Sequence, residues 1–194
     1  ESDRYVRSGA ARLWTTSSGH GIPLLLFNGG PGCDDYLAPV ARMIEDTCQV
    51  IRFEPRGCGR SDWDGNYDVG TLVSDAEAIR QEYGAEKLIV AGHSAGPDYA
   101  LAYALRYPHH VVGLIGIAGG RLVDDREWHA AYVKGKSEVG EDLGGIEFNA
   151  DPEVNIQGNK SGKEGMKRPT ILREIADLQV PGAFINAEKD MITS

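Results

Sequence analysis

Short, wholly apolar runs alternate with amphipathic segments along most of this chain. The amphipathic segments place apolar residues at helical spacing, as at Leu37, Val40 and Ile44. A continuous apolar run such as 23–27 is typical of a strand that is buried on both faces. Strands that alternate with helices predict an α/β fold with a mostly parallel sheet and helices on both faces. We expect strands at 23–27, 49–53, 87–91, 111–118 and 181–186, and helices at 35–46, 72–83, 99–107 and 170–178.

Two regions do not follow this alternation of strands and helices. Residues 5–16 alternate loosely and break at 17–21, which predicts two antiparallel strands and a turn. Residues 133–167 combine recurrent glycines with charged residues and few apolar positions. Such a composition buries little surface, so we expect an irregular insertion here rather than a second core.

Composition and charge narrow the class of protein. The 194 residues carry 20 Lys and Arg against 29 Asp and Glu, a formal charge of −9 that argues against nucleic acid as a partner. No run approaches the roughly 20 apolar residues that a membrane-spanning helix needs. The first residues, Glu1 to Arg4, do not resemble a signal peptide, so we expect a cytoplasmic protein without a membrane partner. The three cysteines have no metal-binding spacing and are expected to be free thiols.

The sequence Gly92-His-Ser-Ala-Gly96, which we call the elbow, has the form G-x-S-x-G. It follows one expected buried strand and opens an expected helix. In that context the serine sits on a sharp strand-to-helix turn, and the two glycines avoid collisions with neighbouring backbone. We therefore predict that Ser94 is a nucleophile, exposed at the carboxyl edge of the sheet. The alternative is a glycine-rich corner with an incidental serine.

A second glycine-rich segment, 28–32, follows the apolar run 23–27, and we call it the glycine loop. Because it leaves the carboxyl end of a strand, it should lie on the same sheet edge as the elbow. Backbone N–H groups in such a loop suit an oxyanion hole. We assign the N–H groups of Gly30 and Ala95 as the two donors. The same glycines would also serve a tight turn with positive φ, and both interpretations can hold together.

A serine hydrolase also needs an acid and a histidine. Asp190 follows the last expected strand, at a position that would direct a carboxylate over the sheet edge. The order Ser then Asp suits the G-x-S-x-G fold, but no histidine follows Asp190 in the sequence. His129 is a weak substitute, while the other four histidines are expected to be structural or exposed: His20, His93, His109 and His110. No zinc spacing or dinucleotide fingerprint is present, so we expect neither a metal nor another cofactor.

With these residues in place, the sequence resembles the α/β-hydrolases, and more narrowly the proline iminopeptidase (prolyl aminopeptidase) family. The resembling segments are 28–33 (NGGPGC), 52–62 (RFEPRGCGRSD), 92–96 (GHSAG), 102–108 (AYALRYP) and 180–190 (VPGAFINAEKD). The resemblance implies Ser94 as nucleophile, Asp190 as acid, and Gly30 with Ala95 as oxyanion donors. It also implies a substrate that is a small molecule or a short peptide.

Several positions differ from the family pattern. Asn28 stands where HGGPG has histidine, and Ala95 stands where a tryptophan usually follows the nucleophile. Family members hold the substrate's ammonium group with acidic residues of a helical cap, and the candidates for that role here are Glu147, Glu153 and Glu188. A serine at the elbow argues against epoxide hydrolases and haloalkane dehalogenases, which carry aspartate there.

The resemblance also suggests a division of the chain. Residues 1–120 would form the first part of a hydrolase core, 121–168 a short irregular cap, and 169–194 an incomplete second part. The family's further helix, last strand and histidine loop have no counterpart after Asp190. We therefore expect impaired activity, and a homo-oligomer formed through an exposed sheet edge.

Two alternatives to this hypothesis remain. A non-catalytic hydrolase-fold protein would bind a small ligand or a partner without turnover. In the second alternative, residues after 194 or a second chain supply the histidine. Labelling of the serine and the reading frame of the natural source protein distinguish these alternatives.

Overall fold

The computed structural model describes residues 2–119, 134, 149–166 and 168–186. The strands of this part form a seven-stranded sheet with the order β1-β2-β4-β3-β5-β6-β7. The strands from β4 to β7 run parallel, and β1 and β2 are antiparallel additions at one side. Their bounds are β1 Ser2–Ser8, β2 Ala11–Ser18, β3 Ile22–Phe27, β4 Cys48–Phe53, β5 Leu88–His93, β6 Val111–Ile117 and β7 Gly182–Ile185. The expectation of a mostly parallel α/β sheet is confirmed.

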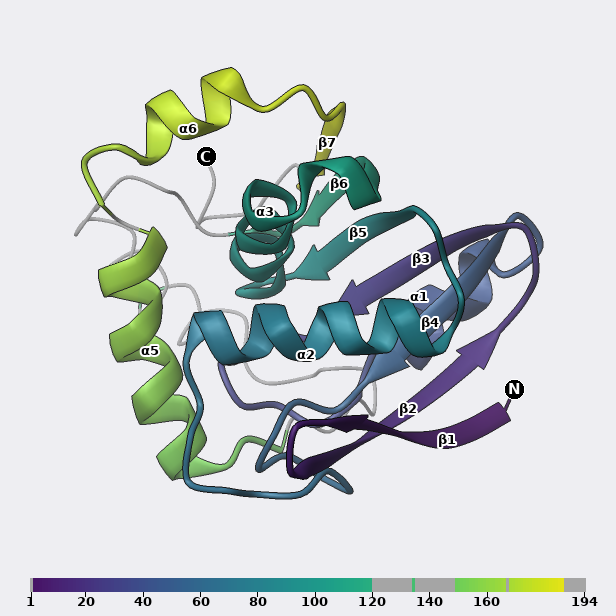
Figure 1. The fold of residues 1–194 in the computed structure, drawn as a ribbon, viewed down its shortest axis with the longest axis horizontal. Coiled ribbons are helices and arrows are strands. Elements are labelled where there is room, and N and C mark those ends of the chain that lie inside the picture. The colour runs from purple at the N-terminus through teal and green to yellow at the C-terminus, as the bar shows by residue number, and fades with distance from the viewer. Residues whose placement is uncertain (1, 120–133, 135–148, 167, 187–194) are drawn as a thin grey trace.

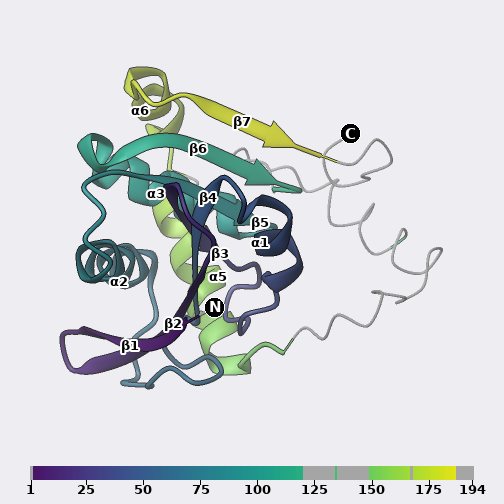
Figure 2. The ribbon, with the colours of Figure 1, turned by 90° about the vertical axis from the view of Figure 1, so that its right-hand side faces the viewer.

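Helices cover both faces of this sheet. Helix α1 lies on one face, and α2, α3 and α6 lie on the other (Figures 1 and 2). The bounds of the four helices are α1 Ala38–Ile44, α2 Val69–Glu82, α3 Gly96–Arg106 and α6 Ile171–Asp177. A short 3-10 helix, η1 (Pro108–His110), precedes β6.

The side chains of a central strand alternate between two cores, one on each face of the sheet. Consecutive residues of such a strand are therefore all apolar. Leu25 and Phe27 belong to the larger core under α2 and α3, whereas Leu24 and Leu26 belong to the smaller core under α1. Successive side chains of a strand point to opposite faces, so a continuous apolar run is needed where both faces are covered. Phe27 and Phe53 meet edge to face, with ring centroids 5.5 Å apart.

The element boundaries differ from the sequence-based expectation at several places, and two of the differences have a local cause. The hairpin turn of β1 and β2 lies at Gly9, where φ is +59°, and not at 17–21, because β2 continues through Ser18. The first helix begins at Ala38 rather than at residue 35. The Asp35 side chain instead accepts a hydrogen bond from the Leu37 N–H at 3.2 Å, which favours a turn before the helix.

The expectation of an irregular insertion is wrong for part of 133–167. Helix α5 spans Pro152–Met166 and lies at the carboxyl edge of the parallel strands (Figure 1). Val154 is completely buried and forms a small cluster with Cys58 and Tyr67. The helix forms because tertiary contacts bury one of its faces, which outweighs the poor helix propensity of its glycines.

Strand β7 pairs only with β6 among the described strands. Its Phe184 side chain is 70% exposed and its Ile185 side chain 57% exposed. Self-association through this edge stays a prediction. No helix in the described part of the chain is long and apolar enough to cross a membrane.

A charged group joins α2 to α3 inside the helical layer. The Glu77 carboxylate accepts hydrogen bonds from Arg80, from Gln81 and from the Tyr103 hydroxyl, the last at 2.7 Å. Burial opposes ionisation, but these donors outweigh it and lower the pKa of Glu77 to about 2. His110 Nδ1 lies 3.4 Å from the same carboxylate.

We expect this carboxylate to make folding stability depend on acid pH. A lowered carboxyl pKa stabilises the folded state above the ordinary value of 4.5, and this stabilisation is lost as pH falls toward 2. The loss should be about 1 to 3 kcal/mol. Urea unfolding from pH 5 to pH 2 should show that the difference in unfolding free energy between wild type and Glu77→Gln decreases over this range. Glu82→Gln, which removes an exposed carboxylate at the end of the same helix, is the control; an unchanged Glu77→Gln difference across the range would contradict the expectation.

Candidate active site

Ser94 lies at the carboxyl end of β5, directly before α3. Its φ is +59°, a left-handed conformation that is rare for a residue with a side chain, and its side chain is exposed. The Ser94 N–H donates to the Ile117 carbonyl at the end of β6, at 3.0 Å. The strained turn and this hydrogen bond hold the hydroxyl above the sheet edge.

The two glycines of the elbow allow its close packing. A Cβ on Gly92 would lie 2.2 Å from the backbone carbon of Gly96, and a Cβ on Gly96 would lie 2.4 Å from the Phe27 carbonyl oxygen. Both contacts are with backbone, which cannot rotate away. Pro97 occupies the first turn of α3, where its missing N–H costs no helical hydrogen bond.

The glycine loop packs directly against the elbow. A Cβ on Gly29 would lie 2.9 Å from Ser94 Cβ and 3.1 Å from the His93 carbonyl oxygen. Gly30 has a φ of +120°, is exposed and is followed by a cis peptide bond to Pro31. The structure therefore brings the loop and Ser94 together, as the strand order predicts.

Asn28, which stands at the histidine position of the HGGPG pattern, is buried at the start of the loop. Its side-chain amide donates to the Phe53 carbonyl at 3.0 Å. Its Oδ1 atom is buried and has no hydrogen-bond partner among the described residues. This side chain therefore links the loop to the end of β4.

Tyr36 joins the glycine loop to the elbow and was not singled out from the sequence. Its hydroxyl accepts the Gly29 N–H at 2.8 Å and lies 2.7 Å from His93 Nδ1. His93 thus contacts a tyrosine whose side chain belongs to the core between the sheet and α1. No local sequence pattern marks this contact, because it joins residues 57 positions apart.

Helix α5 covers the other side of the glycine loop. The Asn155 side-chain amide donates to the Pro31 carbonyl at 2.7 Å, and the Asp151 N–H donates to the Gly32 carbonyl at 3.1 Å. A Cβ on Gly158 would lie 2.4 Å from Pro31 Cβ. The helix that the sequence analysis missed therefore fixes the loop beside Ser94.

Two ion pairs, one fully buried and one half-exposed, involve the loops that follow β3 and β4. Asp35 pairs with Arg52, and both side chains are at most 5% exposed. Glu54 pairs with Arg60, whose guanidinium also stacks over the Trp14 ring. Since charged groups are rarely buried unless they are paired, these pairs specify the loop conformations.

Arg56, in segment 55–59 (PRGCG) after β4, contacts three other parts of the fold. Its guanidinium binds both carboxylate oxygens of Asp75 on α2, at 2.9 and 2.8 Å, and also pairs with Asp64. It also donates to the Ser8 carbonyl at the end of β1, at 3.0 Å. One side chain thereby joins the loop, the hairpin and α2.

The histidines of the described part lie away from the Ser94 hydroxyl or are engaged elsewhere. His20 precedes β3, and His109 and His110 precede β6, so all three lie at the amino edge of the parallel strands. Ser94 follows β5 at the opposite edge. The His93 ring is held by Tyr36, and burial lowers its pKa.

Some sequence-predicted residues lie outside the described residues. These are Asp190, His129, Glu147 and Glu188. Glu153 is described: it is exposed in the first turn of α5, where its carboxylate accepts from Gln157 at 3.3 Å. Of the three acidic candidates for an ammonium group, it is thus the one that lies on the helix against the glycine loop.

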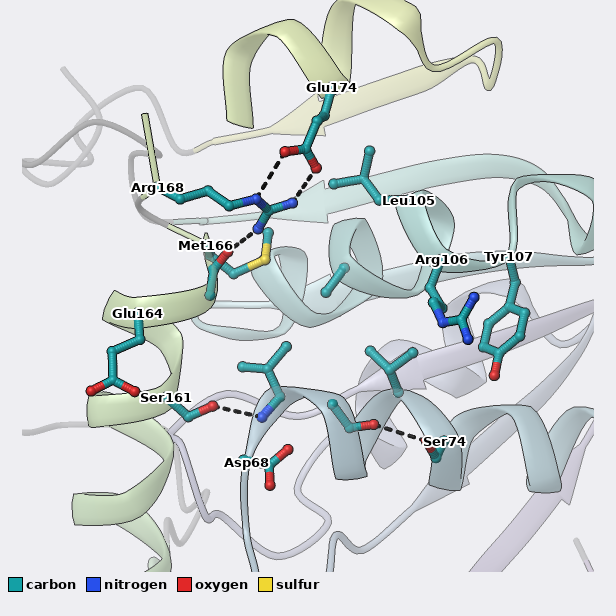
Figure 3. A pocket seen from close by; sticks show the side chains of 15 residues that line it. Asp68, Ser74, Leu105, Arg106, Tyr107, Ser161, Glu164, Met166, Arg168 and Glu174 are labelled. Carbon is teal, nitrogen blue, oxygen red and sulfur yellow. Dashed lines mark hydrogen bonds and ion pairs between the residues drawn. The ribbon is translucent and has the colours of Figure 1, made fainter. Parts of the chain in front are cut away.

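A cavity of about 640 Å³ lies on the sheet face that α2, α3 and α6 cover, between these helices and α5 (Figure 3). Its lining includes Arg106 and Tyr107 at the far end of α3 from Ser94. Neither the elbow nor the glycine loop lines it. This cavity is therefore separate from the candidate active site.

A family comparison agrees with the fold. Residues 22–139 match the family model described as the alpha/beta hydrolase fold. The chain belongs to this family. Proline iminopeptidases are among the curated proteins to which the chain is similar. One from Thermoplasma volcanium is 37% identical over 135 residues, which cover 61% of this chain and 45% of the relative. One from Saccharolobus solfataricus is 36% identical over 101 residues, which cover 50% of this chain and 33% of the relative.

This hydrolase chain therefore spans less than half the length of these curated relatives. Solved structures support the same fold. An alpha/beta fold family hydrolase from Bacillus anthracis str. Sterne superposes with a TM-score of 0.74 at 16% identity, covering 95% of this chain and 81% of that one. A structure from a study of carboxylesterases of Nitrososphaera gargenis gives a TM-score of 0.68 at 17% identity, covering 97% and 82%.

Proposed function

We propose that this hydrolase acts on an ester or amide carbonyl through an acyl-enzyme on Ser94. The observation that carries the proposal is the position of Ser94: an exposed serine with positive φ, between a parallel strand and a helix, in contact with the glycine loop. This combination is typical of a nucleophile elbow.

The chemistry follows from this arrangement. Ser94 Oγ adds to the substrate's carbonyl carbon while a base takes its proton, and the backbone N–H groups of Gly30 and Ala95 donate to the resulting oxyanion. The bond to the leaving amine or alcohol then breaks, and the leaving group takes the proton. Water hydrolyses the acyl-enzyme by the same route in reverse, which restores the Ser94 hydroxyl.

The proposed substrates are short peptides with a free amino terminus, or small esters. The proline iminopeptidases to which the chain is similar support the first class, and Glu153 on α5 is an acidic group for the substrate's ammonium. Asp190 is the proposed acid of the triad. The serine mechanism and the peptidase type are both parts of this proposal.

We further propose that the 194-residue chain turns over substrate slowly. Three described histidines lie at the opposite sheet edge, and the fourth is bound to Tyr36. The members of a triad act as a unit, so a missing or misplaced base lowers the rate by orders of magnitude. His129 is the candidate base that remains in this sequence.

Covalent labelling tests the proposed nucleophile without requiring turnover. Because the same base would activate Ser94 toward the probe, a fluorophosphonate in excess should modify Ser94 slowly, as identified by peptide mass spectrometry, and Ser94→Ala should abolish the labelling. Ser74→Ala removes another exposed serine hydroxyl, one that donates to the Gly70 carbonyl, and should label as wild type does. Labelling that persists in Ser94→Ala would refute the assignment. Saturable ligand binding without any labelling would instead favour a non-catalytic binding protein.

A further inference from the structure

We infer that Tyr36 is a positioning residue that ties the glycine loop to the elbow and so sets the geometry of the oxyanion hole. This inference rests on the proposed function, since it concerns the same Ser94 site. It assigns a role to a side chain that the reaction itself does not consume or modify.

The contacts of Tyr36 are short and largely excluded from water. Its side chain belongs to the core under α1, and the residue is only 9% exposed. The hydroxyl accepts the Gly29 N–H at 2.8 Å and lies 2.7 Å from His93 Nδ1. The Tyr36 and His93 rings meet edge to face, with centroids 5.6 Å apart and an interplanar angle of 79°.

The protonation states of the two rings bear on which of them donates the hydrogen bond. Burial raises the pKa of the Tyr36 phenol and lowers the pKa of the His93 imidazole. Near neutral pH the phenol therefore keeps its proton and the imidazole is neutral. In the arrangement we propose, the phenol oxygen accepts the Gly29 N–H and the phenol proton is donated to His93 Nδ1, so that the His93 proton resides on Nε2.

The contact joins the two residues that directly precede the proposed oxyanion donor and the proposed nucleophile. Gly29 precedes Gly30, a proposed oxyanion donor, and His93 precedes Ser94. A single hydroxyl thereby fixes the distance between one donor and the nucleophile. Oxyanion donors act through pre-organised positions, so a small displacement of the loop weakens stabilisation of the transition state.

The residue beside Tyr36 fixes this loop to β4 and to the residue that follows this strand. The neighbouring Asp35 is buried in an ion pair with Arg52, and its other oxygen accepts the Leu37 N–H at 3.2 Å. The Asp35 N–H also donates to Glu54. Tyr36 is thus held from β4 and can in turn position the glycine loop.

Tyr36→Phe tests the role, because it removes only the hydroxyl. The fluorophosphonate labelling rate at saturating probe should fall about tenfold, while the concentration giving half of the maximal rate changes little. Tyr103→Phe is the matched control. It removes a buried tyrosine hydroxyl that donates to Glu77 between α2 and α3, so it should lower stability but leave the labelling rate unchanged.

Two further measurements separate positioning from simple destabilisation. In nitrogen-15 NMR spectra, wild-type His93 should carry its proton on Nε2, and Tyr36→Phe should change this tautomer balance and speed exchange of the Gly29 amide. Labelling rates of Tyr36→Phe, His93→Phe and the double variant should be non-additive, since both single variants break one network.

The outcomes distinguish this inference from the proposed function. If wild type is not labelled at Ser94 but the NMR changes occur, the proposed function fails while the Tyr36 contact stands. If wild type is labelled at Ser94 and Tyr36→Phe matches its rate, the positioning role is wrong. Equal slowing in Tyr103→Phe would likewise overturn it, because the effect would then reflect stability alone.

Discussion

Replacing Gly92 with alanine is expected to leave little or no folded protein. The new Cβ would lie 2.2 Å from the Gly96 carbonyl carbon and 2.6 Å from the Pro97 nitrogen, so β5 and α3 would have to move apart. The cost should exceed about 4 kcal/mol, a large share of the roughly 5 to 15 kcal/mol that stabilises a typical domain. Urea unfolding followed by circular dichroism, together with the yield of soluble protein, measures the effect.

Gly162→Ala is the matched control for this substitution. Gly162 lies in α5, and a Cβ there would have no neighbour within 4 Å outside the helix's own backbone. Alanine should therefore leave stability unchanged or raise it by about 0.5 to 1 kcal/mol, through helix propensity alone. A Gly92→Ala variant as stable as Gly162→Ala would show that the elbow is not packed as described.

Asp75→Ala is expected to be the second most damaging substitution. The Asp75 side chain is 1% exposed and takes two hydrogen bonds from Arg56, whose own side chain is 11% exposed. Removing the carboxylate leaves a buried guanidinium with the weaker compensation of Asp64 and the Ser8 carbonyl. Breaking a buried pair in this way costs about 3 to 5 kcal/mol.

Asp62→Ala provides the comparison for a surface pair. Asp62 also binds an arginine, Arg12, but the Arg12 side chain is 57% exposed and water replaces the lost partner. We expect a small change in the urea midpoint for this variant and a large one for Asp75→Ala. Similar midpoints for the two variants would contradict the structural role assigned to Arg56.

Much of the fold follows from local patterns. Apolar runs such as 23–27 and 111–118 became strands because both faces of the sheet are covered, and the segment that opens at Gly96 became a helix after the elbow. The position of Ser94 was predictable for the same reason: two glycines and a serine between a buried strand and a helix satisfy the steric needs of one tight turn.

Helix α5 was not predictable from local patterns. Its 15 residues include Gly158, Gly162 and Gly165, which disfavour a helix in isolation. Burial of Val154 against the small cluster near Cys58 and close contact of Gly158 with Pro31 stabilise it in the folded protein. Glycine at 158 therefore serves close packing against the loop, a need that only the three-dimensional arrangement reveals.

The sequence alone predicted most of the strands and helices outside α5, the elbow with Ser94, and the placement of the glycine loop at the same sheet edge. These features depend on spacing within a few residues and on the rule that parallel strands share their carboxyl edge. Only the tertiary structure decided what holds the loop: Tyr36 between Gly29 and His93, and α5 against Pro31. The physical reason is that these contacts join residues up to 124 positions apart, where no periodicity in the sequence records which side chains meet.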